Sequence, residues 1–456
     1  MVVRTLAAVA QKVNGELIGR DTSFDVVSID TRSLSPGALF VAIRGDRFDG
    51  NDFVAEAHSL GAAGALVSSP AAIPLPQVQV NDTREAFGLM AHAWRDNFSL
   101  PVIAVTGSNG KTTVREFIAS ILRVRGQLCV TQGNLNNDLG VPLTLMCLNE
   151  KHRVLIVEMG ANHAGEIAHL SELICPTVGV ITNANCTHLE GFGSLEGVVA
   201  AKGELLEHLP PTGVAVLNAD DHYCNDWRLR SRAETVVTFG FSDGADCCVS
   251  GEPTYGPASS SFTLRLPGAE LLEVHLPLPG RHNILNAMAA AAATFALGTP
   301  PEDIINGLGD AHTVDGRMTL LRGRLGSTIV DDSYNANPAS AKAALDYLSG
   351  KAGRRVFVLG DMAELGPDAG KFHSEVGEYA KDRCDVLIAI GPFSEFAARA
   401  FGNGAHMCVD INAAEDQLSN ALASDVTIVV KGSRVMGLEA LVNKLVEEDS
   451  KNEVGS

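Results

Sequence analysis

The chain has 456 residues, of which 46% are hydrophobic, 5% are aromatic and 20% are charged, and its formal net charge is −19. At about 150 residues per domain, this length predicts about three domains, and the scarcity of aromatic residues favours α/β layers over an aromatic-rich β-sandwich. The acidic balance argues against a nucleic acid or an anionic membrane as partner, although local arginine and lysine residues can still bind a small anion.

Cysteine usage and the distribution of apolar residues both point to the inside of the cell. The nine cysteines form no C-x-x-C pair, and the adjacent Cys247 and Cys248 are poorly placed for a disulfide, so we expect reduced thiols. The first residues do not resemble a signal peptide. No apolar run reaches the ~18 residues of a membrane helix. The sequence therefore predicts a cytoplasmic protein without membrane insertion.

Residues 1–81 form the first predicted block, in which short strands alternate with one helix. The expected elements are strands Val26–Ile29, Leu39–Ile43, Ala65–Val67 and Val78–Val80 and helix Asp52–Leu60. Two polar clusters, residues 28–33 and 44–50, follow strands, and such loops often carry ligand contacts. Solvated surface charge explains both clusters equally well on the pattern alone.

The second predicted block, residues 82–314, contains the most informative segment of the chain. An apolar strand, Val102–Val105, ends in a glycine turn, and Lys111-Thr112-Thr113 then opens a segment with helical periodicity. Glycines let backbone N–H groups approach phosphate oxygens, and the helix N-terminus adds positive partial charge. Lys111 would reach the β- and γ-phosphates of a nucleotide, and the Thr112 hydroxyl would bind Mg²⁺.

The spacing of this loop is unusual. Gly-x-x-Gly-Lys-Thr-Thr is shorter than the general phosphate-loop pattern, which would need a glycine where Val105 stands. An ordinary strand-to-helix turn with an incidental lysine is the alternative, but the double threonine serves no packing need. The residues expected to bind the nucleotide are Gly107, Ser108, Asn109, Gly110, Lys111, Thr112 and Thr113.

The rest of the second block repeats strand and helix several times. Its expected elements are helix Thr83–Asn97, strands Leu128–Thr131, Val154–Val157, Val178–Ile181, Val214–Leu217 and Thr235–Phe239, a β-rich stretch at 247–279 and an alanine-rich helix, Asn283–Leu297. Glu158 ends one strand and is a candidate magnesium ligand. His188 follows another and could bind a second cation, although a lone histidine is more often structural. Lys202 is by default a surface lysine.

The third predicted block, residues 315–456, alternates strands with helices and indicates a parallel, doubly wound sheet that binds ligands at the strand C-termini. The expected strands are Ser327–Val330, Val356–Leu359, Val386–Ile390, Met407–Val409 and Val426–Val430. Polar loops follow three of them at 331–338, 360–366 and 431–434, and a ligand site and a solvated loop are about equally compatible with each. Near the boundary with the second block, Arg317 offers a guanidinium for phosphate, and the Asn283 amide could read an adenine edge.

Four long segments together resemble the Mur ligase family of peptidoglycan synthesis. They are Thr106–Thr113 with its short glycine spacing, Glu158–Asn162, Asp332–Pro338 and Gly360–Gly366. The resemblance covers essentially the whole chain in order. It implies three α/β domains: a small N-terminal domain, a central domain of phosphate-loop ATPase type with a mostly parallel sheet, and a C-terminal Rossmann-like domain.

Within the family, the chain is most similar to the members that add D-alanyl-D-alanine to UDP-N-acetylmuramoyl-tripeptide. We expect a monomer. The resemblance implies a ligase in which Lys111 and Thr112 serve ATP and magnesium. Glu158 and His188 would hold metal, together with Lys202 as a carbamate; Asn283 would contact the adenine and Arg317 the phosphates. The first domain would bind the UDP-sugar through Ser28, Thr31, Arg32 and Arg47, and Asp332, Asn335 and Asn337 would face the nucleotide and position the dipeptide.

The implied chemistry starts from a carboxylate, which is a poor electrophile until ATP converts it to an acyl phosphate. The dipeptide amine then attacks, which gives an amide, ADP and phosphate, while cations offset charge on the transferring phosphoryl group. Other amide ligases of this fold remain alternatives, namely the diaminopimelate- or lysine-adding Mur ligase and folylpolyglutamate synthase. The 335–338 segment, Asn-Ala-Asn-Pro, argues against them. An ATP-hydrolysing switch is the alternative from another class.

Overall fold

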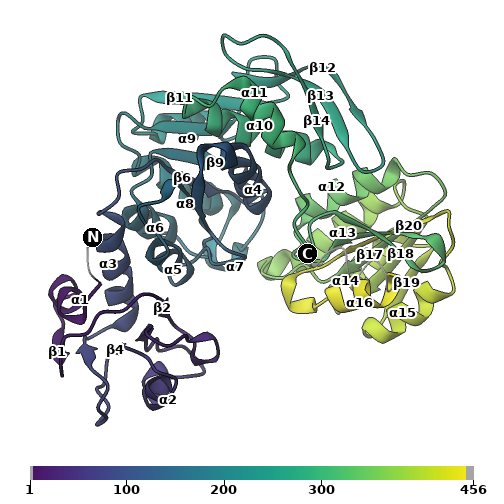
Figure 1. Ribbon diagram of the computed structural model, residues 1–456. Helices are drawn as coiled ribbons and strands as arrows, with labels where there is room; N and C mark the ends of the chain where they lie inside the picture. Colours follow the sequence, from purple (N-terminus) through teal and green to yellow (C-terminus); the bar gives the residue numbers. More distant parts are fainter. Residues whose placement is uncertain (1–3, 448–456) are drawn as a thin grey trace.

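The computed structural model describes residues 4–447 and contains three sheets, which follow one another along the chain (Figure 1). Residues 1–3 and 448–456 lie outside the described range, so the outer ends of the first and third predicted blocks do too. Among residues 4–447, no helix is long and apolar enough to cross a membrane.

The first sheet has five strands in the order β1-β5-β4-β3-β2, and all neighbours are parallel except β1 and β5. Its elements are β1 (Glu16–Ile18), β2 (Val27–Ser28), β3 (Leu39–Val41), β4 (Gly64–Val67), β5 (Gln77–Gln79), α1 (Leu6–Lys12) and α2 (Val54–Ser59). The sequence analysis did not predict α1 or β1. The edge strand β1 is only three residues long and is not fully buried, so it has almost no hydrophobic pattern.

Helix α3 (Thr83–Arg95) connects the first sheet to the central part of the molecule. The Asp82 carboxylate caps it by accepting the Arg84 and Glu85 N–H groups at 2.8 and 3.1 Å. Its buried face packs against α1 on one side and against α5 (Gly140–Met146) and α6 (Glu166–Ile174) on the other.

The central sheet has nine strands in the order β14-β13-β12-β11-β10-β9-β6-β8-β7. The strands from β6 to β12 pair in parallel, and two antiparallel pairings add β13 and β14. The strands are β6 (Val102–Thr106), β7 (Gln127–Val130), β8 (His152–Glu158), β9 (Val178–Ile181), β10 (Val214–Asn218), β11 (Thr235–Gly240), β12 (Cys247–Tyr255), β13 (Ser260–Arg265) and β14 (Leu272–Leu276). Every strand predicted in this block is therefore present.

Helices cover both faces of the central sheet. On one face α4 (Lys111–Leu122) packs directly against α10 (Arg281–Ala296), where seven buried residues from Ala287 to Ala293, mostly alanine, permit close approach. The opposite face carries α5, α6 and α8 (Leu195–Glu207). Shorter helices are α7 (Leu189–Phe192), α9 (Cys224–Arg230) and α11 (Pro301–Gly309).

The third sheet has six strands in the order β15-β16-β20-β17-β18-β19. Five are parallel, as predicted, while β15 adds an unpredicted antiparallel edge. The elements are β15 (Thr319–Arg322), β16 (Thr328–Asp332), β17 (Arg354–Gly360), β18 (Val386–Ile390), β19 (Ala405–Cys408), β20 (Val426–Lys431), α12 (Pro338–Ser349), α13 (Ala369–Ala380), α14 (Ser394–Phe401), α15 (Ile411–Ser419) and α16 (Glu439–Leu445).

Candidate active site

The loop between β6 and α4 depends on its two glycines. Gly107 and Gly110 have φ values of +142° and +83°, which disfavour other residues. A Cβ would lie 2.0 Å from Thr182 Oγ1 at Gly107 and 2.3 Å from Asn286 Oδ1 at Gly110. Neighbouring elements therefore pack directly against the loop backbone, and a larger residue at either position would push them apart.

Residues that follow β9 brace this loop. The Ser108 N–H donates to the Asn183 carbonyl and the Asn109 N–H to Asn183 Oδ1, both at 3.0 Å. Thr182 Oγ1 in turn donates to the Asn109 carbonyl at 2.6 Å. Because these two loop N–H groups already have acceptors, a phosphate would rely on other N–H groups, including those of the first turn of α4.

Lys111 lies at the start of α4 and curls back over the loop. Its Nζ donates to the Gly107 carbonyl at 2.7 Å. Burial lowers the pKa of Lys111; Glu158 opposes that shift and Arg317 adds to it. The lysine is therefore held in place before any ligand arrives, with a second cation close by.

Glu158 ends β8 and is 2% exposed. Its Oε1 accepts from Asn136 Nδ2 at 2.8 Å, and its Oε2 accepts from Arg115 Nη1 at 3.1 Å. Neither partner of Glu158 was predicted from the sequence. Asn136 belongs to a polar run after β7, which was a readable signal, whereas Arg115 lies one turn into α4 and had none. Each carboxylate oxygen keeps a further lone pair for another ligand.

Lys202 is 1% exposed, so the default expectation of a surface lysine is wrong. It lies on the buried face of α8, with its Nζ 5.4 Å from the centre of the Phe192 ring. Burial, together with the charge of Lys111, lowers the pKa of Lys202 to about 7. Near neutral pH a large share of this amine is therefore unprotonated and nucleophilic.

His188 connects the central part of the molecule to the third sheet. It precedes α7 with a φ of +53°, and its ring forms an ion pair with Glu364. This pairing lowers the pKa of the Glu364 carboxyl. The predicted metal ligand thus contacts Gly360–Gly366, one of the polar loops that follow strands of the third sheet.

A cavity of about 970 Å³ lies between the phosphate loop and the third sheet. It brings together most residues predicted to bind nucleotide, metal or dipeptide: Ser108, Asn109, Gly110, Lys111, Thr113, Glu158, His188, Asn283, Arg317, Asp332, Asn335 and Asn337. Gly107, Thr112 and Lys202 do not line it. Thr112 is 6% exposed and lies behind the loop on α4.

The third sheet contributes a buried ion pair to this cavity. Lys431, at the end of β20, lies with its Nζ 2.6 Å from Asp332 Oδ2 and 3.0 Å from the Asn335 carbonyl. Lys431 is 2% exposed. The sequence analysis singled out the loop that begins at Lys431 but assigned this lysine no role.

Two asparagines join the phosphate loop to the third part directly. Asn337 Nδ2 donates to Asn109 Oδ1 at 2.6 Å, and Asn109 Nδ2 donates back at 3.3 Å. Asn337 also caps α12 by accepting the Ser340 N–H at 2.9 Å. The 332–337 segment was predicted to lie near the nucleotide loop, and it contacts that loop directly through Asn337.

Arg317 and Asn283 both line the cavity. The Arg317 guanidinium carbon is 4.4 Å from the centre of the Tyr334 ring, a cation–π arrangement that orients it. Asn283, at the start of α10, donates its amide to the Pro279 carbonyl at 2.8 Å. Both side chains are thus held by neighbours.

The four residues predicted to bind the UDP-sugar lie outside the described cavity lining. Ser28 donates to the Asp30 carbonyl, Thr31 donates to Glu56, and Arg32 forms an exposed ion pair with Asp30. Arg47 is exposed. The cavity approaches the first sheet only through Asp82, Arg84 and Glu85. The sugar-binding role of the four residues stays a prediction.

Comparisons with known proteins agree with this architecture. Three family models match: "Mur ligase family, catalytic domain" at residues 23–95, "Mur ligase middle domain" at 105–294 and "Mur ligase, glutamate ligase domain" at 316–434. A UDP-N-acetylmuramoyl-tripeptide–D-alanyl-D-alanine ligase from Escherichia coli (strain K12) is 42% identical over 98% of this chain and 99% of its own length.

Two solved structures show the same arrangement of the whole chain. MurF from Acinetobacter baumannii is 34% identical, with a TM-score of 0.92 over 97% of this chain and 98% of the other. MurF ligase from Thermotoga maritima in complex with ADP is 27% identical, with a TM-score of 0.82 over 92% and 96%. In sequence and in fold, this chain belongs to the Mur ligase family.

Proposed function

We propose that this chain is an ATP-dependent amide ligase that joins D-alanyl-D-alanine to UDP-N-acetylmuramoyl-tripeptide in peptidoglycan precursor synthesis. The observation that carries the proposal is the cavity in which the phosphate loop and the 332–337 segment face each other. Full-length relatives carrying that activity in their names support the choice of substrates.

In the proposed reaction, a carboxylate oxygen of the tripeptide attacks the γ-phosphorus of ATP, and ADP leaves. The dipeptide amine then attacks the acyl carbon, and the C–O bond to phosphate breaks. Lys111 and Arg317 lie where they can offset charge on the transferring phosphoryl group, and the N-terminus of α4 binds its oxygens.

Magnesium fits the donors on the nucleotide side of the cavity. The Glu158 carboxylate lines the cavity as a hard oxygen ligand, and the hydrogen bonds from Arg115 and Asn136 leave lone pairs on it. Thr112 does not line the cavity, so its hydroxyl would have to turn toward the ion to bind it. The ion would neutralise phosphate charge when bound. His188 and a carbamylated Lys202 would complete the proposed set; the burial of Lys202 and its pKa of about 7 support carbamylation, because CO₂ adds to a neutral amine.

The remaining ligands would occupy the two ends of the cavity. Asn335 and Asn337, with Asp332 behind them, would position the dipeptide next to the acyl phosphate. The Asn283 amide would contact the adenine. Ser28, Thr31, Arg32 and Arg47 would bind the UDP-sugar, whose peptide would enter the cavity past Arg84 on α3.

We also propose how the protein is organised and where it works. The chain would consist of a UDP-sugar-binding domain at 1–81, an ATP-binding domain at 82–314 and a ligase domain at 315–456. The three separate sheets support this division. We propose a monomer that works in the cytoplasm, where its nucleotide substrates are found.

Phosphate release tests the function. We expect ATP turnover only when UDP-N-acetylmuramoyl-tripeptide and D-alanyl-D-alanine are both present, with much slower turnover when single amino acids or glutamate replace the dipeptide. Equal turnover without either substrate would instead identify an ATPase switch, and turnover driven by diaminopimelate, lysine or glutamate would identify another ligase of this fold.

A further inference from the structure

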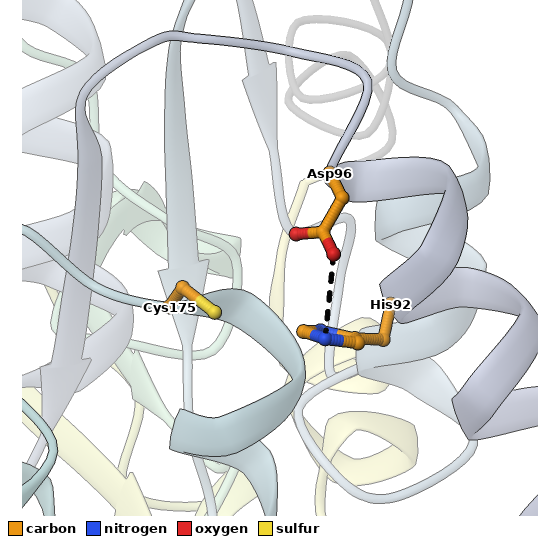
Figure 2. A group of neighbouring side chains, drawn as sticks. All are labelled: His92, Asp96 and Cys175. Carbon is orange, nitrogen blue, oxygen red and sulfur yellow. Dashed lines mark ion pairs between the residues drawn. The ribbon is translucent and has the colours of Figure 1, made fainter.

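Three metal-ligating side chains meet at the contact between α3 and the C-terminal end of α6 (Figure 2). His92 and Asp96 are one helical turn apart, and Cys175 is the residue that follows α6. One ligand atom from each lies within 4.8 Å of the other two, and no other such group occurs among residues 4–447. None of the three lines the central cavity.

The hydrogen bonding of His92 leaves one ring nitrogen facing Asp96. His92 Nδ1 lies 3.0 Å from the Leu173 carbonyl oxygen, which can only accept, so Nδ1 carries the proton. On a neutral ring, Nε2 then carries a lone pair, and this nitrogen lies 3.6 Å from Asp96 Oδ2. These two acceptor atoms face each other at a spacing that a single bound cation can bridge.

The same helix fixes the position of the third ligand. Arg95 donates from Nε to the Ile174 carbonyl at 2.8 Å and from Nη2 to the Cys175 carbonyl at 3.5 Å. Together with the His92 bond, these contacts attach three successive carbonyls at the end of α6 to α3. The His92 and Arg95 bonds to these carbonyls use neither Nε2 nor the thiol. The Cys175 thiol donates to the Glu172 carbonyl at 3.4 Å, and Asp96 Oδ1 lies 4.0 Å from Arg95 Nη1, so a cation would have to replace the thiol bond and share the carboxylate with Arg95.

We propose that His92, Asp96 and Cys175 bind a zinc-class divalent cation through imidazole nitrogen, carboxylate oxygen and thiolate sulfur. Three such ligands plus water suit tetrahedral Zn²⁺, and a histidine whose other nitrogen donates to a backbone carbonyl is typical of zinc sites. Mg²⁺ prefers an octahedral shell of oxygens. On binding, the thiol proton passes to solvent and a metal–sulfur bond forms.

Only side-chain rotation is needed to complete the site. Tetrahedral zinc separates its ligand atoms by roughly 3.4–3.7 Å, so the exposed Asp96 and Cys175 side chains would close in by about 1 Å. The ion would then tie α3, the helix that follows the first sheet, to α6, whose first turn lines the cavity at Glu166. The expected consequence is a stiffer connection between the first and central parts.

Cobalt provides a direct probe, because thiolate-bound Co²⁺ absorbs in the near ultraviolet. We would titrate the full-length protein with Co²⁺ in excess Mg²⁺, which saturates oxygen sites. The expected result is one equivalent with a thiolate band, displaced by Zn²⁺. Cys175→Ser should abolish the band, and His92→Gln should weaken binding at least ~10-fold. Cys147→Ser, at another exposed cysteine, is the matched control and should behave as wild type.

Alkylation of the thiol provides a readout that does not depend on the spectrum. Zn²⁺ should protect Cys175 from iodoacetamide, as mapped by mass spectrometry, and should leave Cys147 reactive. Zn²⁺ should also raise the unfolding temperature of wild type but not of Cys175→Ser. Binding without a thiolate band, equal affinity in Cys175→Ser, or unprotected Cys175 would overturn the proposal and leave His92 and Asp96 as a side-chain contact without a metal.

Discussion

The phosphate loop and the polar loops that follow β2 and β3 both place charged side chains after strands. Neighbouring elements hold the backbone of the phosphate loop, whereas the arginines of the other two loops are exposed. Thr182 and Asn183 hold the backbone between Gly107 and Lys111. In the first part, Arg32 bonds to Asp30 two residues away and is 88% exposed. A site that stabilises a transferring phosphoryl group needs charges fixed in advance, whereas an exposed arginine must be ordered by its ligand.

The largest effect should come from the braced loop. Lys111→Ala should reduce ligation and ATP turnover by roughly 10³-fold, because it removes a positioned cation from the phosphoryl group. The unfolding temperature should change little. Lys151→Ala, an exposed lysine of the same part, serves as control. Near-normal ATP turnover by folded Lys111→Ala would show that the loop held by Thr182 and Asn183 is not the catalytic loop.

Lys202 extends the comparison between fixed and exposed charges to a fully buried lysine that does not line the cavity. Lys202→Ala should lose roughly 10²-fold in activity, and a short-chain carboxylic acid should restore part of it by supplying the oxygens of the carbamate. Kinetics with and without added acetate provide the measurement. Full activity of Lys202→Ala in plain buffer would refute the carbamate.

The pKa of Lys202 also predicts a dependence of stability on pH. Its pKa falls from 10.5 to about 7 on folding, so below pH 10.5 the unfolded chain binds more protons at this site. The destabilisation is largest below about pH 7 and fades as the pH rises toward 10.5. The gain of unfolding free energy in Lys202→Met should therefore be roughly 3 kcal/mol larger at pH 6.5 than at pH 9.5, in CO₂-free denaturant titrations. An equal change at both pH values would contradict a buried, depressed amine.

On the opposite cavity wall, Lys431→Met should destabilise the protein by roughly 3–5 kcal/mol, because Asp332 then carries a buried, unpaired charge. Adding Asp332→Asn should recover much of this loss, since both charges are gone. Activity should stay low in both variants if Asp332 acts on the substrate. A double variant no more stable than Lys431→Met would show that the pair is not coupled.

Substitutions in the exposed loops of the first part should have the smallest effect on activity and stability. Arg47→Ala should raise KM for UDP-N-acetylmuramoyl-tripeptide about 10-fold, with kcat nearly unchanged and stability within ~0.5 kcal/mol of wild type. Arg20→Ala, also exposed in the first part, is a suitable control. An unchanged KM would remove Arg47 from the substrate site.

Sequence patterns predicted the parts of the fold that have strong local signals. Buried parallel strands such as β6 and β9 were found because each is an uninterrupted apolar run between turns. The edge strands β1 and β15 were missed because they are short and their residues are partly exposed. The phosphate loop was recognisable because its glycines and Lys111 are adjacent in sequence.

Local sequence patterns could not predict contacts between segments that are far apart in the chain. The pairing of Asn109 with Asn337, and of Lys431 with Asp332, depends on how two sheets pack, which no local spacing encodes. The burial of Lys202 did have a signal, since Val198, Ala201, Lys202 and Leu205 share one face of α8 at helical spacing. Residue type alone predicts a surface position for a lysine, which is the wrong environment for Lys202.

The acyl phosphate is the central claim of the account, and isotope transfer tests it most directly. The tripeptide carboxylate that is to be ligated would carry ¹⁸O, and the phosphate released with ATP and D-alanyl-D-alanine would be analysed by mass spectrometry. If the carboxylate attacks ATP and its oxygen leaves with phosphorus, each phosphate carries one ¹⁸O from the substrate. Phosphate without ¹⁸O, alongside amide formation or simple hydrolysis, would contradict the account.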